Sequence, residues 1–313
     1  MERRSRERIK GRGAVANPAG RFEVHRCDPV DDGWSLCDEP EPSPHTIVTP
    51  EVTTQIVTEN DSPDVPFSRS INPYRGCEHG CTYCFARPTH SFLGLSPGLD
   101  FETRIISKPK AAEALRSHFE KVGYEAVPIA LGANTDPYQP TERKLEITRD
   151  LLKVFREYRH PVSIITKSST VLRDIDLLQD LARDGLTQVF LSVTTLDGEL
   201  ARRMEPRASS PSSRLKAIRI LSKAGIPTGV LASPMIPGLN DAELEAILER
   251  AARSGARTAG YILLRLPLEL KGLFEGWLEA NYPDRSQKVL NLMRQMRGGE
   301  LYQSQFGTRM RGR

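Results

Sequence analysis

Short apolar runs rich in β-branched residues alternate with longer amphipathic segments from Ser68 onward. Apolar runs bounded by turn residues are typical of buried strands, whereas apolar residues that recur near a 3.6-residue period indicate helices. We expect strands near Arg69–Ile71 and over Val127–Leu131, Val162–Thr166, Gln188–Val193, Thr228–Leu231 and Tyr261–Leu264. We expect helices over Pro109–Lys121, Glu142–Tyr158, Asp174–Arg183, Ser212–Ala224 and Asp241–Arg253.

The helical segments carry recognisable faces and ends. In Glu142–Tyr158 one apolar stripe is expected to face the core, and it consists of Leu145, Thr148, Leu152, Phe155 and Tyr158. Gly185, Gly225 and Gly255 each follow a helical pattern, where a left-handed cap favours a residue without a Cβ.

Strand–helix units of about thirty residues predict parallel strands that are joined by right-handed crossovers. Six such units predict an α/β fold, a partial (β/α)6 TIM-like barrel, because a closed eight-stranded barrel needs more chain. We place this core at residues 67–267. Residues 268–313 are expected to form a helical C-terminal cap, with a helix over Arg285–Met296, and a basic tail.

The composition of residues 1–66 predicts a polar, largely irregular N-terminal extension. Between Cys27 and Ser68 there are ten acidic residues and no Lys or Arg, and several prolines interrupt any helix. The β-rich stretch Thr46–Val57 is expected to lie against the body as an edge strand.

Charge is concentrated at the two ends of the chain. Residues 1–13 hold six Lys or Arg and two Glu, and residues 294–313 hold five Arg and one Glu, so each end is near +4. Because the net charge of the whole chain is +4, the body of the chain between the two ends has a net charge of about −4. We interpret the basic ends as solvated tails, and the charge of the body disfavours a broad nucleic-acid surface. No apolar run is long enough to cross a bilayer, which favours a cytoplasmic protein.

The strongest chemical pattern is Cys77-Glu-His-Gly-Cys81-Thr-Tyr-Cys84, directly after a predicted strand. Thiolates bind iron–sulfur clusters, which usually take four cysteines. Three thiolates leave one iron open, and that iron can bind the amino and carboxylate groups of S-adenosylmethionine. Cys27 and Cys37 are expected to be free thiols, because a cytosolic protein disfavours disulfides.

Zinc is the alternative metal. His79 or His90, or Cys27 or Cys37, would then complete a four-ligand site. The spacing is not that of paired zinc knuckles, nor the C-x2-C-x2-C of a ferredoxin loop. The corresponding function is a zinc-stabilised nucleic-acid-binding module that uses the basic tails.

The segment from Asn72 to His90, NPYRGCEHGCTYCFARPTH, resembles radical S-adenosylmethionine (SAM) proteins of the spore photoproduct lyase-like group, often called DNA repair photolyases. The resemblance extends from about Ser68 to Tyr282. It implies a [4Fe-4S] cluster on Cys77, Cys81 and Cys84, and reductive cleavage of SAM to a 5′-deoxyadenosyl radical that abstracts hydrogen from a substrate. It also implies an external electron donor such as flavodoxin or ferredoxin, and damaged DNA as a possible substrate.

The resemblance also implies cofactor-binding residues at the carboxyl ends of the predicted strands, where barrel active sites assemble. Tyr83 would present its backbone to the adenine, Lys167 would meet the cofactor carboxylate, and Ile236 would form an apolar wall. The full set is Tyr83, Asn134, Thr135, Asp136, Lys167, Ser192, Ile236 and Tyr261.

Candidate catalytic residues are named for two reasons: their position near the cysteine motif, and the absence of a cysteine that could donate hydrogen. Spore photoproduct lyase donates hydrogen from a Cys near the end of its second strand, but no Cys follows Cys84 in this chain. A tyrosine is the alternative donor, and we name Tyr138 and Tyr261. His90 lies just past the last Cys, where it could face the substrate, and Arg207 could pair with a carboxylate of cofactor or substrate.

Overall fold

The computed structural model describes residues 9–23 and 44–312. A seven-stranded sheet has the order β10-β9-β8-β7-β6-β3-β2. The six strands from β10 to β3 pair in parallel, and β2 lies antiparallel to β3 at one edge. The bounds are β2 Val57–Glu59, β3 Arg69–Ile71, β6 Ile129–Leu131, β7 Val162–Thr166, β8 Thr187–Ser192, β9 Thr228–Met235 and β10 Thr258–Leu263.

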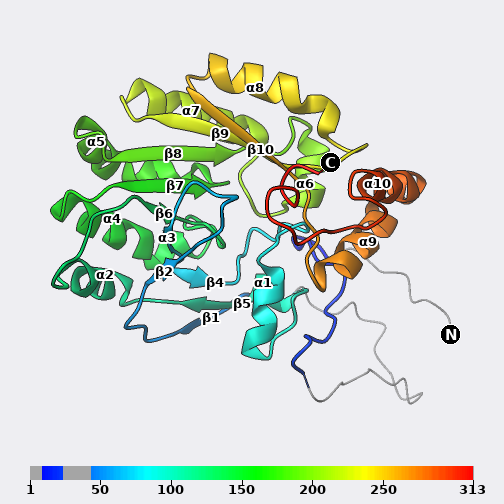
Figure 1. The fold of residues 1–313 in the computed structure, drawn as a ribbon, viewed down its shortest axis with the longest axis horizontal. Helices are drawn as coiled ribbons and strands as arrows, with labels where there is room; N and C mark the ends of the chain where they lie inside the picture. The colour runs from blue at the N-terminus through cyan, green and yellow to red at the C-terminus, as the bar shows by residue number, and fades with distance from the viewer. Residues whose placement is uncertain (1–8, 24–43, 313) are drawn as a thin grey trace.

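Helices cover the outer face of this sheet, as Figure 1 shows. Leu152 and Phe155 of α4 pack into the same buried core as Ile164 of β7 and Leu191 of β8. The covering helices are α2 Ala111–Phe119, α3 Glu142–Leu145, α4 Ile147–Glu157, α5 Ile175–Arg183, α7 Pro211–Lys223 and α8 Leu244–Arg253, with 3₁₀ helices η2 Ser169–Asp174 and η3 Asp241–Glu243. The predicted partial barrel of six parallel units is therefore confirmed.

The three predicted glycine caps are confirmed, because Gly185, Gly225 and Gly255 have φ angles of 70°, 80° and 103°. The single helix expected over Glu142–Tyr158 is wrong in its first turns. The chain breaks at Glu146, whose φ is 52°, and Leu145 is exposed. The buried Glu142 carboxylate accepts the Thr148 N–H, which would otherwise lack a partner in the first turn of α4.

A second, smaller sheet has the order β1-β5-β4. Its strands are β1 Ile47–Pro50, β4 Tyr74–Arg75 and β5 Arg104–Ser107, and the short helices η1 Arg87–Leu93 and α1 Asp100–Thr103 lie between β4 and β5 in the chain. The β-rich stretch Thr46–Val57 thus supplies strand β1 and the first residue of β2, the edge strand of the large sheet.

The C-terminal part contains two helices, α9 Leu270–Asn281 and α10 Pro283–Gln295, where the sequence predicted one. They lie with α6, Gly198–Met204, on the side toward which strands β8 and β9 point in Figure 1. Trp277 of α9 donates its indole N–H to the Arg203 carbonyl of α6 at 3.1 Å. No helix in the described ranges is long and apolar enough to span a membrane.

The basic ends are more ordered than the sequence suggested. Arg309 forms a salt bridge with Asp64, and Arg297 is buried and donates to the Leu264 carbonyl. At the other end, Arg12 is buried and donates to the Glu102 carbonyl at 3.0 Å. The expectation of purely solvated tails is therefore wrong for the described parts of both ends.

Candidate active site

The three motif cysteines lie on one loop that follows strands β3 and β4. Cys77 and Cys81 are buried, Cys84 is half-buried, and all three are free thiols. The loop turns at Gly76 and Gly80, which have φ angles of 78° and 67°, a region that glycine enters without strain. The sequence therefore brings three thiols together in one tight loop. Cys27 and Cys37 lie outside the described residues.

A buried arginine anchors this cluster loop from behind. Arg87 donates its Nε–H to the Cys81 carbonyl at 2.9 Å and pairs with the buried Glu102. The Cys77 N–H donates to the Phe101 carbonyl at 2.9 Å. These contacts fix the backbone on which the thiols are mounted.

The donor set fits an iron–sulfur cluster. Burial raises the pKa of Cys81 to about 12, and it also raises the pKa of Cys77. Such thiols keep their protons at neutral pH until a metal displaces them. Three thiolates can hold a cluster and leave one iron for a further ligand.

The zinc alternative finds no support in the geometry. His79 Nδ1 lies 3.2 Å from Asp136, and His90 Nε2 contacts the Arg104 carbonyl at 3.0 Å, so each ring already faces another protein group. Across residues 9–23 and 44–312, no three His, Cys, Asp or Glu side chains are arranged to hold a single metal ion. Thiolates of a cluster bind different irons, so they need not converge on one point.

Asp136 ties the end of β6 to the end of β7. Its carboxylate accepts from the Thr166 hydroxyl and the Lys167 N–H, both at 2.7 Å, and from the Tyr138 N–H at 2.9 Å. Burial opposes its ionisation, but His79, 3.2 Å away, the Lys167 N–H and the Thr166 hydroxyl outweigh burial and lower the pKa of Asp136 to about 2. Its oxygens are therefore occupied by protein donors.

Lys167 lies beside the cluster loop. Its Nζ is 5.8 Å from the centre of the Tyr83 ring, and Tyr83 packs in one apolar cluster with Cys81 and Ile236. Burial favours the neutral amine, but Cys81 and Glu205 outweigh burial and raise the pKa of Lys167. A charged ammonium next to the thiols suits a carboxylate ligand.

Glu205 and Arg214 form a fully buried ion pair that sequence reasoning missed. Glu205 also accepts from the hydroxyls of Tyr83 and Thr194. Arg214 donates to the Ser192 carbonyl at 3.0 Å. No local pattern signals this network, because its members lie on four separate segments.

The remaining predicted cofactor residues lie in different settings. The Thr135 hydroxyl donates to the Tyr74 carbonyl at 2.8 Å, whereas the Asn134 side chain is exposed. The Ser192 hydroxyl donates to the Ser233 carbonyl at 3.2 Å. Tyr261 is 52% exposed on β10.

The predicted catalytic residues are engaged by the protein itself. His90 is fully buried, packs edge-on against Phe101 with ring centres 5.3 Å apart, and has a pKa lowered by burial. Tyr138 is fully buried and donates to Asp174 at 3.1 Å. These are structural contacts, and a catalytic role for either residue stays a prediction.

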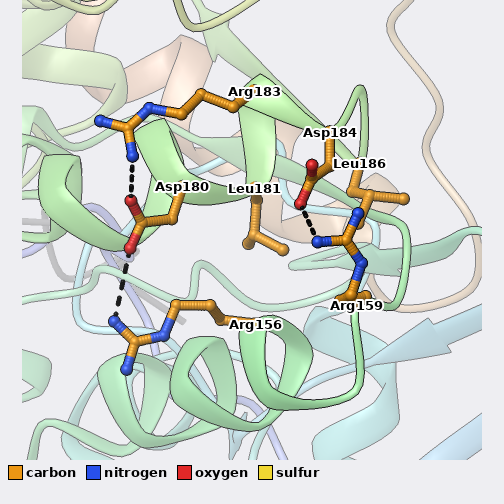
Figure 2. A pocket seen from close by; sticks show the side chains of 7 residues that line it. All are labelled: Arg156, Arg159, Asp180, Leu181, Arg183, Asp184 and Leu186. Carbon is orange, nitrogen blue, oxygen red and sulfur yellow. Dashed lines mark hydrogen bonds and ion pairs between the residues drawn. The ribbon is translucent and has the colours of Figure 1, made fainter.

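A cavity of about 280 Å³ lies elsewhere, between α4 and α5. Figure 2 shows Asp180 between Arg156 and Arg183, and Asp184 paired with Arg159. Leu186, at its edge, directly precedes β8, so the cavity lies at the amino ends of the strands. Active sites of such barrels lie at the opposite, carboxyl ends.

Three buried or half-buried thiols at the carboxyl end of a parallel strand define an iron–sulfur enzyme of the partial-barrel type. The sequence profile of the Radical SAM superfamily matches residues 71–251, more than half of the chain. The chain belongs to the Radical SAM superfamily. Its cofactors are therefore a [4Fe-4S] cluster and SAM, and the zinc-stabilised module is wrong.

Uncharacterized relatives match most of this chain, and a solved structure shares its fold. An uncharacterized protein of Mycobacterium tuberculosis H37Rv is 34% identical over 232 residues, which is 74% of this chain and 68% of that protein. An uncharacterized protein of Methanocaldococcus jannaschii is 29% identical over 221 residues, 71% of this chain and 79% of that protein. Spore photoproduct lyase complexed with dinucleoside spore photoproduct superposes with a TM-score of 0.53 at 19% identity, covering 75% of this chain and 66% of that one.

Proposed function

We propose that this chain cleaves SAM reductively and uses the product radical to abstract hydrogen from a nucleic-acid substrate. When bound on Cys77, Cys81 and Cys84, the reduced cluster would supply one electron for cleavage of the sulfonium C5′–S bond of SAM, with release of methionine, and the resulting carbon radical would take a hydrogen atom from a substrate carbon. A flavodoxin- or ferredoxin-class carrier would supply the electron.

The observation that supports SAM binding, the first part of the proposal, is the position of Lys167. Its ammonium lies beside Tyr83 and Cys81 at the carboxyl end of β7. A cation there can hold the carboxylate of a ligand whose other end meets the cluster. Tyr83 and the buried Ile236 supply an apolar wall for the adenine.

The nucleic-acid half is supported by an exposed aromatic side chain at the cluster loop. Phe85, directly after Cys84, is 43% exposed, and the guanidinium of Arg265 lies 5.4 Å from its ring centre. Arg265 follows β10, so both residues lie at the carboxyl ends of the strands. Aromatic and arginine side chains are the groups on which nucleobases stack. The fold is shared with spore photoproduct lyase, which binds a dinucleoside photoproduct.

Anaerobic turnover tests the proposal. Reconstituted protein reduced with dithionite is expected to convert SAM to 5′-deoxyadenosine, and replacement of Cys77, Cys81 and Cys84 by Ala is expected to abolish this. Lys167→Gln should keep the iron content and raise the KM for SAM about tenfold or more, because a charged hydrogen bond is lost. Unchanged SAM cleavage in the triple variant would overturn the proposal.

The substrate is tested separately on wild-type protein. DNA is expected to stimulate 5′-deoxyadenosine formation, and deuterated DNA should transfer deuterium to it. Cleavage that is indifferent to damaged and undamaged DNA would remove nucleic acid as the substrate while leaving the radical chemistry intact.

A further inference from the structure

A cavity of about 80 Å³ lies beside the cluster loop. It is bounded by His79 of that loop and by the segments that follow β6, β7 and α6. These segments are at the carboxyl ends of the strands, where the substrate must enter. The lining residues are His79, Tyr138, Pro140, Arg143, Ser168, Thr170, Arg207, Ala208 and Ser209.

The lining is cationic and rich in hydroxyls. Arg143 and Arg207 are the guanidinium groups, and none of the nine residues is acidic. Arg207 is placed by its own N–H, which donates to the His79 carbonyl at 3.3 Å, and by Glu78 at 3.2 Å outside the lining set. Arg143, on α3, is exposed.

The hydroxyls of Ser168, Thr170 and Ser209 line the same cavity. Ser168 is buried, and its oxygen accepts the Thr170 N–H at 3.2 Å, which leaves its proton to donate. The Ser209 oxygen accepts the Ser169 N–H at 2.9 Å. Hydroxyl donors and guanidinium forks together suit an oxyanion that accepts several hydrogen bonds.

The volume of the cavity limits its ligand to a small chemical group. It has room for more than one water molecule but not for a nucleobase with its sugar. A phosphate group combines this size with the charge and the acceptor oxygens that the lining requires.

We infer that the cavity lined by Arg143 and Arg207 binds a phosphate group of the nucleic-acid substrate and thereby sets where the strand lies relative to the cluster loop. The inference rests on the proposed function, because it takes the ligand from the same substrate. Phosphate contacts of this kind position a strand and carry no sequence information.

The cavity in Figure 2 provides the contrast. Its arginines face Asp180 and Asp184, with Arg183 2.8 Å from Asp180 and Arg159 2.7 Å from Asp184. Those carboxylates would repel a phosphate. Arg183→Gln therefore removes one positive charge from a cavity that should not contact nucleic acid, and it is the matched control.

The experiment measures binding of a fluorescein-labelled single-stranded 12-mer to reconstituted protein by anisotropy at several salt concentrations. Arg143→Gln and Arg207→Gln should each weaken binding about tenfold. They should also reduce the slope of log K against log salt by about 0.7, the value for one phosphate on a single strand. Arg183→Gln should match wild type. Arg143 is exposed, so its variant should fold, and equal melting temperatures confirm this.

A second arm titrates inorganic phosphate into wild type and the Arg143→Gln variant by calorimetry. Oligonucleotide binding that depends on Arg143 supports the inference. Phosphate binding that depends on Arg143, with oligonucleotide binding that does not, means that the cavity takes free phosphate and overturns the inference. Insensitivity in both arms also overturns it. DNA-stimulated cleavage of SAM by wild-type protein is scored separately, so a failure of the inference is distinguished from a failure of the proposed function.

Discussion

At the scale of single residues, Glu205 is the acceptor of a buried network next to the cluster loop. Burial opposes its ionisation, but Arg214 and Lys167 outweigh burial and lower the pKa of Glu205. The side chains of Glu205 and Arg214 are 0% and 1% exposed. A carboxylate that balances two cations in so dry a position cannot be lost without leaving them unpaired.

We expect Glu205→Gln to lower the free energy of unfolding by about 3–5 kcal/mol, because the Arg214 guanidinium stays buried without its anion. Urea unfolding of the reduced apoprotein measures this. The matched control is Glu199→Gln, whose partner Arg203 is one helical turn away and whose side chain is 66% exposed. That pair should contribute about 1 kcal/mol or less. Equal losses in the two variants would contradict a structural role for the buried network.

The site residues that the sequence predicted and those that it missed differ in the separation of their partners along the chain. The three cysteines lie within eight consecutive residues, so the cluster loop could be predicted from the sequence. Lys167 and Ser192 could be placed because strand ends converge in a parallel barrel. Glu205 could not, since it meets Tyr83 across 122 residues of chain. Only the folded chain brings those two side chains together.

At the scale of elements, the segment Arg12–Val15 crosses the outside of the cluster loop. The N–H groups of Gly13 and Ala14 donate to the Glu102 carboxylate at 2.9 and 2.8 Å. Val15 packs against the apolar cluster that contains Cys81. Glu102 therefore links this segment to Arg87, the anchor of the loop.

Gly13→Ala should release this segment, because a Cβ at that position would overlap the backbone oxygen of Gly80. Trypsin should then cut after Arg12 or Arg21 several-fold faster, and the reconstituted cluster should bleach faster in air. Gly198→Ala is the control, since a Cβ there meets nothing within 4 Å. If both variants resist trypsin as wild type does, the segment does not depend on this close approach.

Element boundaries failed where a tertiary contact replaced a local signal. The apolar period runs unbroken through residues 142–158, so the pattern favoured one helix. The break at Glu146 arises because Glu142 is held by Tyr74 and Arg173 and accepts the Thr148 N–H. Tyr74 lies on β4, a strand too short for its pattern to reveal.

At the scale of the whole molecule, the histidine of the cluster loop and a structural histidine lie at opposite ends of the strands. His79 belongs to the cluster loop, whereas His160 precedes β7 at the amino ends. His160 stacks on Phe119 with ring centres 4.3 Å apart, and its Nε2 lies 2.6 Å from the Tyr124 hydroxyl. Burial, together with the nearby Arg69 and His118, lowers the pKa of His160 to about 4.

This depressed pKa makes the stability of the fold depend on pH. The unfolded chain binds a proton at His160 near pH 6.5, but the folded chain resists it until about pH 4. The neutral His160 therefore leaves the free energy of unfolding undiminished above pH 6.5. As pH falls from 6.5 toward 4, proton binding by the unfolded chain lowers this free energy. His160→Phe, which keeps a ring on Phe119, should flatten the slope of unfolding free energy against pH in that window by at most one proton. Leu221→Ala, on α7, removes core packing without a titrating group, so it should lower stability to a similar extent at every pH. A slope that survives in His160→Phe would assign the acid sensitivity to other groups.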